Sequence, residues 1–121
     1  MTALLVTGGS GFIGSHLVDA LVATGRHRVT VLSRNPRLFG DLPAGANFVQ
    51  GSLDDAPLVR RVLSEGRIEG VFHAAWTTTH ETSLENVVAD VTGNVHATLN
   101  LLEACRKEGV RRVVFLSSGG T

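Results

Sequence analysis

The most constraining feature of the chain is an apolar run near its start that breaks at a series of glycines. Ala3 to Val6 predict a short buried strand, and helical spacing of apolar residues begins at Phe12. Between them, Gly8, Gly11 and Gly14 follow the spacing G-x-x-G-x-x-G. The first backbone N–H groups of a helix have no partner within it. A strand, a glycine turn and a helix start therefore predict a cradle for nucleotide phosphates.

Each glycine has a predicted role in this cradle. Gly8 gives the tight turn, Gly11 lets the backbone approach the phosphates, and Gly14 lets the helix pack closely on the strand. The same glycines also suit a purely structural turn, so the motif alone is only a hypothesis about binding.

The composition is that of an ordinary globular protein and excludes several classes. The chain has 121 residues, which predicts one domain, and 43% of them are apolar. A formal net charge of zero argues against nucleic acid or an anionic membrane as a partner. Apolar runs stay shorter than the roughly 18 residues of a membrane span, and the N-terminus lacks the basic region of a signal peptide. The single cysteine, Cys105, favours a reducing compartment and hence the cytoplasm.

Strand and helix patterns alternate along the whole chain. Alternation predicts parallel β-α-β units with right-handed crossovers. The fold class is therefore α/β, a Rossmann-type three-layer sandwich with strand order 3-2-1-4-5. Its crevice is expected beyond the ends of the first and fourth strands, where Gly8–Gly14 and Ala74–Trp76 meet. The predicted strands are 3–6, 28–33, 47–50, a strand centred on 71–72, and 112–117; the predicted helices are 12–24, 54 or 55 to 64, and 83–107.

The last predicted helix carries one continuous apolar face. Its residues step by three or four positions, and a glycine, Gly93, interrupts the pattern next to Asn94. The face either covers the sheet or contacts another molecule. It consists of Val88, Val91, Val95, Leu99 and Leu102.

Four segments, in order, resemble one family. Thr7 to Leu17 (TGGSGFIGSHL) resembles the start of the extended short-chain dehydrogenases/reductases, the NAD(P)-dependent sugar epimerase/dehydratase family. Val71 to Ala75 is similar to the family's fourth strand, Asn94 to Ala104 to its fourth helix, and Val110 to Ser118 to its fifth strand. The resemblance implies that 1–121 form the N-terminal portion of an NAD(P)-binding domain, with the substrate domain absent from this chain.

The resemblance also implies which residues contact the cofactor. They come from the glycine turn, the ends of the strands and the fourth helix. They are Gly8, Gly11, Phe12, Ile13, Gly14, Ser33, Arg34, Ser52, Leu53, Ala74, Ala75, Trp76, Asn94 and Ser117. No metal ligand set is predicted, because no two histidines have metal-ligand spacing with a third ligand.

Two positions depart from the family pattern. NAD-preferring members end the second strand with an acid, but here the strand ends Ser33-Arg34. Arg34 can pair with a 2′-phosphate, which favours NADP over NAD, although it also suits a solvated loop. After the third strand the family often has Gly-Asp, where this chain has Gly51-Ser52. Ser52 can still hydrogen-bond the adenine, with Leu53 packing on its ring.

The family's catalytic acid/base pair is missing. By resemblance, members transfer a hydride between a sugar carbon and nicotinamide, with a Tyr and a Lys four residues later handling the proton. This chain contains no tyrosine, and its one lysine is Lys107. Ser118 is the candidate catalytic hydroxyl, although it also suits a simple strand end. We therefore expect an inactive portion of a longer enzyme, with a complete small module as the alternative.

Three functions follow from these observations. The first is the cofactor-binding portion of an NAD(P)-dependent nucleotide-sugar epimerase, dehydratase or reductase. The second is a non-catalytic NAD(P)-sensing regulator of the same superfamily. The third, a flavin- or S-adenosylmethionine-binding protein, fits the glycine spacing poorly. The resemblance adds a nucleotide sugar as substrate, and a homodimer through the long fourth helix as one interpretation of its apolar face. His80 and Trp76, after the fourth strand, are candidates for contacting the ribose or sugar and for capping the pocket.

Overall fold

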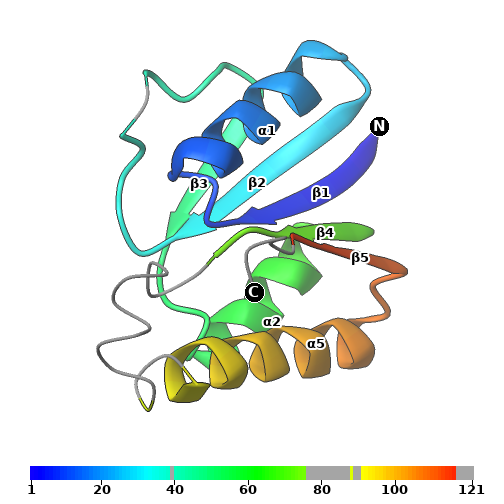
Figure 1. Cartoon of the computed structure of the whole chain (residues 1–121). Coiled ribbons are helices and arrows are strands. Elements are labelled where there is room, and N and C mark those ends of the chain that lie inside the picture. Colours follow the sequence, from blue (N-terminus) through cyan, green and yellow to red (C-terminus); the bar gives the residue numbers. More distant parts are fainter. Residues whose placement is uncertain (39, 76–87, 89–90, 117–121) are drawn as a thin grey trace.

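The computed structural model describes residues 1–38, 40–75, 88 and 91–116, and its core is a parallel sheet (Figure 1). The sheet has five strands in the order β3-β2-β1-β4-β5, which confirms the predicted topology. Every pairing is parallel, with Val6 opposite Val31 on one side and Phe72 on the other. The strands are β1 Thr2–Thr7, β2 His27–Ser33, β3 Ala46–Gln50, β4 Gly70–His73 and β5 Arg112–Phe115.

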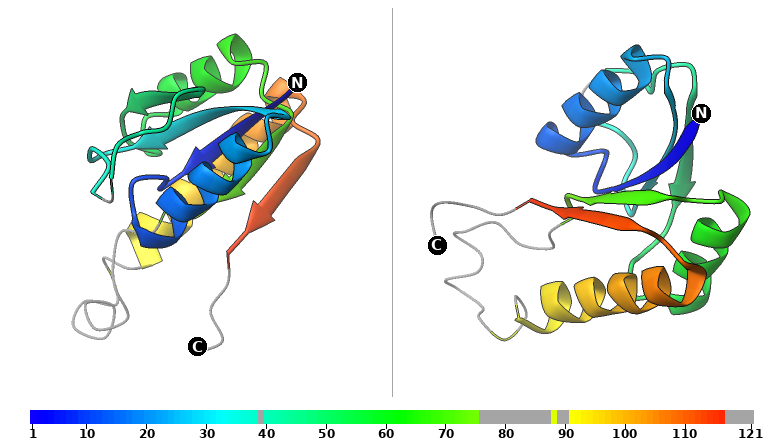
Figure 2. Two further views of the ribbon diagram at one scale, coloured as in Figure 1. Left: turned by 90° about the horizontal axis from the view of Figure 1, so that it is seen from above. Right: turned by 90° about the vertical axis from the view of Figure 1, so that its right-hand side faces the viewer.

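Helices cover both faces of this sheet, as the views in Figure 2 show. Helix α1 (Phe12–Ala23) packs on one face, where Val18 joins Val6, Val29 and Val31 in a buried cluster. Helices α2 (Ala56–Glu65) and α5 (His96–Glu108) pack on the other face over a larger cluster. The central strands β1, β2 and β4 are thus largely buried, whereas the edge strands β3 and β5 are mostly exposed.

Local signals set where the helices on the second face begin and end. The Asp55 carboxylate caps α2 by accepting the Leu58 N–H at 3.1 Å, which decides between the two predicted helix starts, 54 and 55. Gly66 ends that helix, and Gly109 ends α5 in a left-handed conformation with φ 72°. The helix ends were therefore predictable from local chemistry.

The predicted long helix differs from the observed one. Of the predicted range 83–107, the structure describes only 88 and 91–107; Val91–Val95 form a π-helical segment, and the α-helix begins at His96. The irregularity falls at Gly93, where the sequence predicted one. The apolar face points outward: Val95, Leu99 and Leu102 are 49%, 59% and 44% exposed. The residues packed inward are Ala97, Leu101, Ala104 and Cys105.

Other predictions hold with small changes. Burial raises the pKa of the Cys105 thiol to about 11, which fits a core residue rather than a nucleophile. Strand β5 ends at Phe115, two residues before the predicted end. Among the described residues, no helix combines the length and the apolar character needed to cross a bilayer.

Candidate cofactor-binding site

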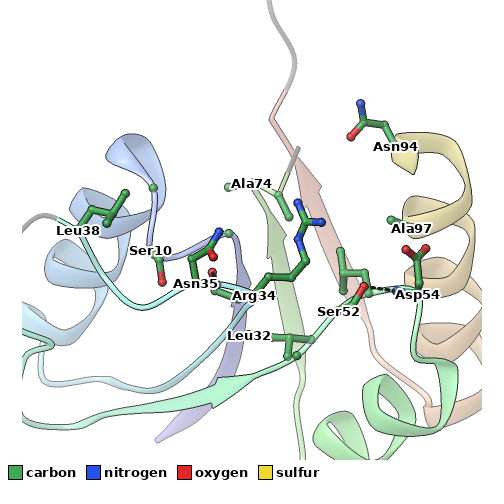
Figure 3. A pocket seen from close by; sticks show the side chains of 16 residues that line it. Ser10, Leu32, Arg34, Asn35, Leu38, Ser52, Asp54, Ala74, Asn94 and Ala97 are labelled. Atoms are coloured by element: carbon green, nitrogen blue, oxygen red, sulfur yellow. Dashed lines mark hydrogen bonds between the residues drawn. The ribbon is translucent and has the colours of Figure 1, made fainter. Parts of the chain in front are cut away.

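A pocket opens where the strands β1 to β4 end, next to the start of α5 (Figure 3). It combines backbone from two strand ends with polar side chains from two others. Its lining comprises Gly8, Ser10, Gly11, Leu32, Ser33, Arg34, Asn35, Leu38, Gly51, Ser52, Leu53, Asp54, Ala74, Ala75, Asn94 and Ala97. This is the carboxyl edge of the sheet, at the point where the strand order reverses, as predicted.

The glycine turn forms one wall of this pocket, and two of its glycines are required by close contacts. Gly8 has φ +68°, and a β-carbon there would lie 2.7 Å from the carbonyl oxygen of Ala74. A β-carbon on Gly14 would overlap the carbonyl oxygen of Gly8. Any larger residue at either position would push β4 or α1 away from the turn. The turn and close-packing roles predicted for these glycines are therefore confirmed in the geometry.

The start of α1 suits an anion. Gly11 is the N-cap, no described side chain caps this helix end, and the first turn carries no acidic residue. The helix dipole places partial positive charge there. The buried hydroxyl of Ser10, a lining residue, has no hydrogen-bond partner among the residues that the structure describes. A glycine cradle, an uncapped helix start and an orphaned hydroxyl together fit the pyrophosphate of a dinucleotide.

The end of β2 supplies the positive charge of the pocket. The Arg34 side chain extends from the strand end into the pocket in Figure 3, close to Asn35. The backbone of this turn is held in place, because Gln50 donates to the Arg34 carbonyl at 3.2 Å and Ser33 Oγ accepts the Asn35 N–H at 3.4 Å. The pocket thus presents a guanidinium, an amide and a hydroxyl from consecutive residues.

The loop after β3 lies opposite and is tied to α5. The side-chain amide of Asn100 donates to the carbonyls of Leu53 and Asp54, at 3.1 and 3.3 Å. His96 Nδ1 lies 2.7 Å from the Asp54 carboxylate. Within the loop, Ser52 Oγ accepts the Asp54 N–H at 3.1 Å. Leu53 is 8% exposed and belongs to the core, so it supports the loop as well as lining the pocket.

The remaining wall comes from β4 and the π-helical segment. Ala74 and Ala75 follow β4, and their small side chains leave the pocket open beside Gly8. Asn94 is 6% exposed and lies in the π-helical segment, a form of helix often found at functional sites. The predicted site residues of β4 and the fourth helix therefore converge on the pocket.

Several predicted residues do not line this pocket. The side chains of Phe12 and Ile13 are 63% and 62% exposed, and Gly14 serves the packing of α1 on the turn. Trp76, His80, Ser117 and Ser118 lie outside the described residues. Conversely, the sequence reasoning did not single out Ser10, Asn35, Leu38 or Asp54. Each is a near neighbour of a predicted residue, and that adjacency was the only sequence signal for them.

Metal chemistry has no support in the described part of the chain. No group of three or more His, Cys, Asp or Glu side chains is placed there to hold an ion. His73 is 1% exposed, and its ring nitrogens contact the hydroxyls of Thr7 and Thr98.

These features define a class: a doubly wound α/β protein with a candidate dinucleotide site at the switch point of its sheet. Comparison with known proteins identifies the family within this class. The model of the NAD dependent epimerase/dehydratase family matches residues 4–121. The chain belongs to that family.

Individual relatives agree with this assignment. The chain is 36% identical over 117 residues to a putative UDP-glucose 4-epimerase of Methanocaldococcus jannaschii, covering 97% of this chain and 38% of the relative. It is 39% identical over 122 residues to the UDP-glucose 4-epimerase of Mycolicibacterium smegmatis, covering 97% of this chain and 39% of the relative. The chain thus spans well under half the length of these relatives.

Solved structures show the same relationship. A UDP-glucose 4-epimerase of Thermus thermophilus in complex with NAD superposes with a TM-score of 0.87 and 42% identity, over 98% of this chain and 38% of that one. The UDP-glucose 4-epimerase of Thermotoga maritima with UDP-glucose superposes with a TM-score of 0.89 and 37% identity. The match covers 98% of this chain and 38% of that one.

Proposed function

We propose that this chain is the cofactor-binding portion of an NAD(P)-dependent enzyme that acts on nucleotide sugars. One observation carries the proposal: the uncapped start of α1 and the Gly8 turn share a pocket with the ends of β2, β3 and β4. A linear dinucleotide needs such a crevice. Its pyrophosphate would lie on the Gly8–Gly14 turn, with the adenosine beside Arg34 and Ser52. The nicotinamide half would lie toward Ala74, Ala75 and Asn94.

The proposed reaction class rests on the relatives. Those named above are UDP-glucose 4-epimerases, and one of them is in complex with UDP-glucose. Nicotinamide supplies a hydride acceptor and donor, and the protein supplies position and proton transfer. We propose an epimerase, dehydratase or reductase of nucleotide sugars as the parent activity, with Ser118 as the residue that orients the substrate hydroxyl. The 121 residues contain no tyrosine, so we expect no turnover from them alone.

The choice between NAD and NADP rests on opposing observations. Arg34 lines the pocket just after β2 and could pair with a 2′-phosphate, and no acidic residue ends β2. By contrast, solved relatives from Thermus thermophilus, Bifidobacterium longum and Brucella ovis are described as complexes with NAD or NAD+. The preference for NADP stays a prediction from Arg34.

A direct binding measurement tests the proposal. Titration of the full-length protein with NADH and NADPH, followed by nicotinamide fluorescence, is expected to show saturable binding with at least one of them. Gly14→Ala is expected to abolish it, because the added methyl group overlaps the Gly8 carbonyl. Absence of binding to both dinucleotides contradicts the proposal.

The second candidate is a regulator that senses NAD(P) without turnover, because such a protein would need the same pocket but no catalytic Tyr and Lys. Hydride exchange separates the two functions. A full-length protein that binds the dinucleotide but transfers no hydride from any nucleotide sugar is a sensor.

We also propose a homodimer through α5. Val95, Leu99 and Leu102 form an exposed apolar stripe, and a second copy of the chain would cover it.

A cytoplasmic location is proposed on the single free cysteine.

A further inference from the structure

His73 joins three walls of the pocket without lining it. It is the last residue of β4 and is 1% exposed. Its Nδ1 lies 2.7 Å from the hydroxyl of Thr7, the last residue of β1. Its Nε2 lies 3.0 Å from the hydroxyl of Thr98, in the first turn of α5. These partners are 66 and 25 positions away in the sequence, so only the folded chain brings them together.

The hydrogen bonds that link Ala74, Thr7, His73 and Thr98 form a series in which one arrangement of the protons is favoured. The Ala74 N–H donates to Thr7, shared between its hydroxyl and its carbonyl oxygen at 3.1 Å each. Thr7 can then donate its hydroxyl proton to His73 Nδ1. A neutral ring with its proton on Nε2 donates in turn to the Thr98 hydroxyl. Both ring nitrogens of His73 then have a hydroxyl partner, one as acceptor and one as donor.

Each end of the series holds pocket residues in place. On one side, Thr7 precedes Gly8 and binds the backbone of Ala74, where Gly8 makes its close approach. On the other side, Thr98 lies one turn after Asn94 and directly follows Ala97, and both line the pocket. The imidazole therefore spans the distance between the β1–β4 wall and the α5 wall.

We propose that His73 is a positioning residue, whose two hydrogen bonds to Thr7 and Thr98 set the separation of the walls that hold the dinucleotide. The inference rests on the proposed function, since it concerns the same pocket. It adds that affinity for the dinucleotide depends on a side chain that does not touch it. A packing role alone would require only a ring of similar size.

Variants of Thr98 and His73 separate these roles in the full-length protein. Thr98→Val removes one hydroxyl with little change in shape, and Thr98→Ser restores it. His73→Phe removes both hydrogen bonds, while His73→Asn keeps an acceptor near Thr7 and His73→Gln keeps a donor near Thr98. The matched control is Val59→Ala, a fully buried core residue that does not line the pocket.

The readouts are the dissociation constant for NADH or NADPH and the melting temperature without ligand. Thr98→Val is expected to weaken binding about tenfold and His73→Phe more, with recovery in Thr98→Ser and partial recovery in His73→Asn and His73→Gln. Val59→Ala should lower the melting temperature and leave affinity within about twofold. Long-range ¹H–¹⁵N correlation spectra should show a neutral ring protonated on Nε2.

The outcomes distinguish this inference from the proposed function. If the unaltered protein binds neither dinucleotide, the proposed function fails and the inference fails with it. If the unaltered protein binds, but Thr98→Val and Val59→Ala have the same affinity, His73 has only a packing role. A spectrum showing the proton on Nδ1 also overturns the proposed arrangement. If His73→Phe fails to fold, the affinities of Thr98→Val and Thr98→Ser for the dinucleotide test the proposal instead.

Discussion

A β-carbon on Gly8 would lie 2.7 Å from the carbonyl oxygen of Ala74, so the turn after β1 and the end of β4 are in direct backbone contact. The two residues come from opposite halves of the described chain. Their contact closes the base of the pocket and leaves no room for a side chain between the phosphate turn and β4.

Replacement of Gly8 is therefore expected to cost both stability and binding. Gly8→Ala adds the strain of a left-handed alanine to a steric overlap, for a combined loss of about 2–5 kcal/mol. Gly25→Ala is the matched control, because Gly25 has nearly the same φ, +69° against +68°, with nothing within 4 Å of its β-carbon. The control should lose only about 1–2 kcal/mol. Equal losses in urea denaturation would contradict the close-contact interpretation.

Arg34→Ala tests the choice of cofactor. Loss of a charge-assisted bond to a 2′-phosphate should weaken NADPH binding by about tenfold or more and leave NADH within about threefold. Arg111→Ala is the control, because Arg111 is an exposed arginine that does not line the pocket. If the unaltered protein binds NADH at least as tightly as NADPH, the predicted preference for NADP is wrong.

The stability of the protein should depend on pH through His73. Burial lowers the pKa of His73 from 6.5, so the unfolded chain takes up the proton first as the pH falls. Stability is fully present above the unfolded pKa and falls as the pH drops toward the lower folded value, by up to about 1.4 kcal/mol per pH unit. Urea denaturation at pH 7.5 and 5.5 measures this loss in the free energy of unfolding. His73→Asn should show a smaller loss, and an equal loss would assign the effect to other groups.

The exposed stripe on α5 predicts the state of association. Leu99→Glu and Leu102→Glu together should convert a dimer to a monomer in sedimentation-velocity runs, because charges replace apolar contacts at positions 59% and 44% exposed. The melting temperature of the monomer should change little. Arg61→Glu, an exposed change of charge on α2, is the control. A monomeric unaltered protein would contradict the proposed homodimer.

Most of the fold was predictable because its signals are local. Glycines at 66 and 109, the Asp55 cap and runs of β-branched residues place the helix and strand ends within a few residues. The glycine motif likewise predicted the pocket wall that contains Gly8. The side chains of Phe12 and Ile13 were harder to place, because helical spacing does not tell which side of α1 is buried, and both are exposed.

By itself, then, the sequence determined the alternation of strands and helices, the strand order and the carboxyl-edge position of the pocket. Periodicity and caps depend only on neighbouring residues, and the right-handed crossover rule then limits how the predicted strands can join one sheet. The tertiary structure alone decided which of two apolar faces of α5 is buried. Small side chains at Ala97 and Ala104 let that helix pack closely, and Leu99 is left outside. Tertiary structure also brought His73 between Thr7 and Thr98, a contact among distant residues that no local pattern encodes.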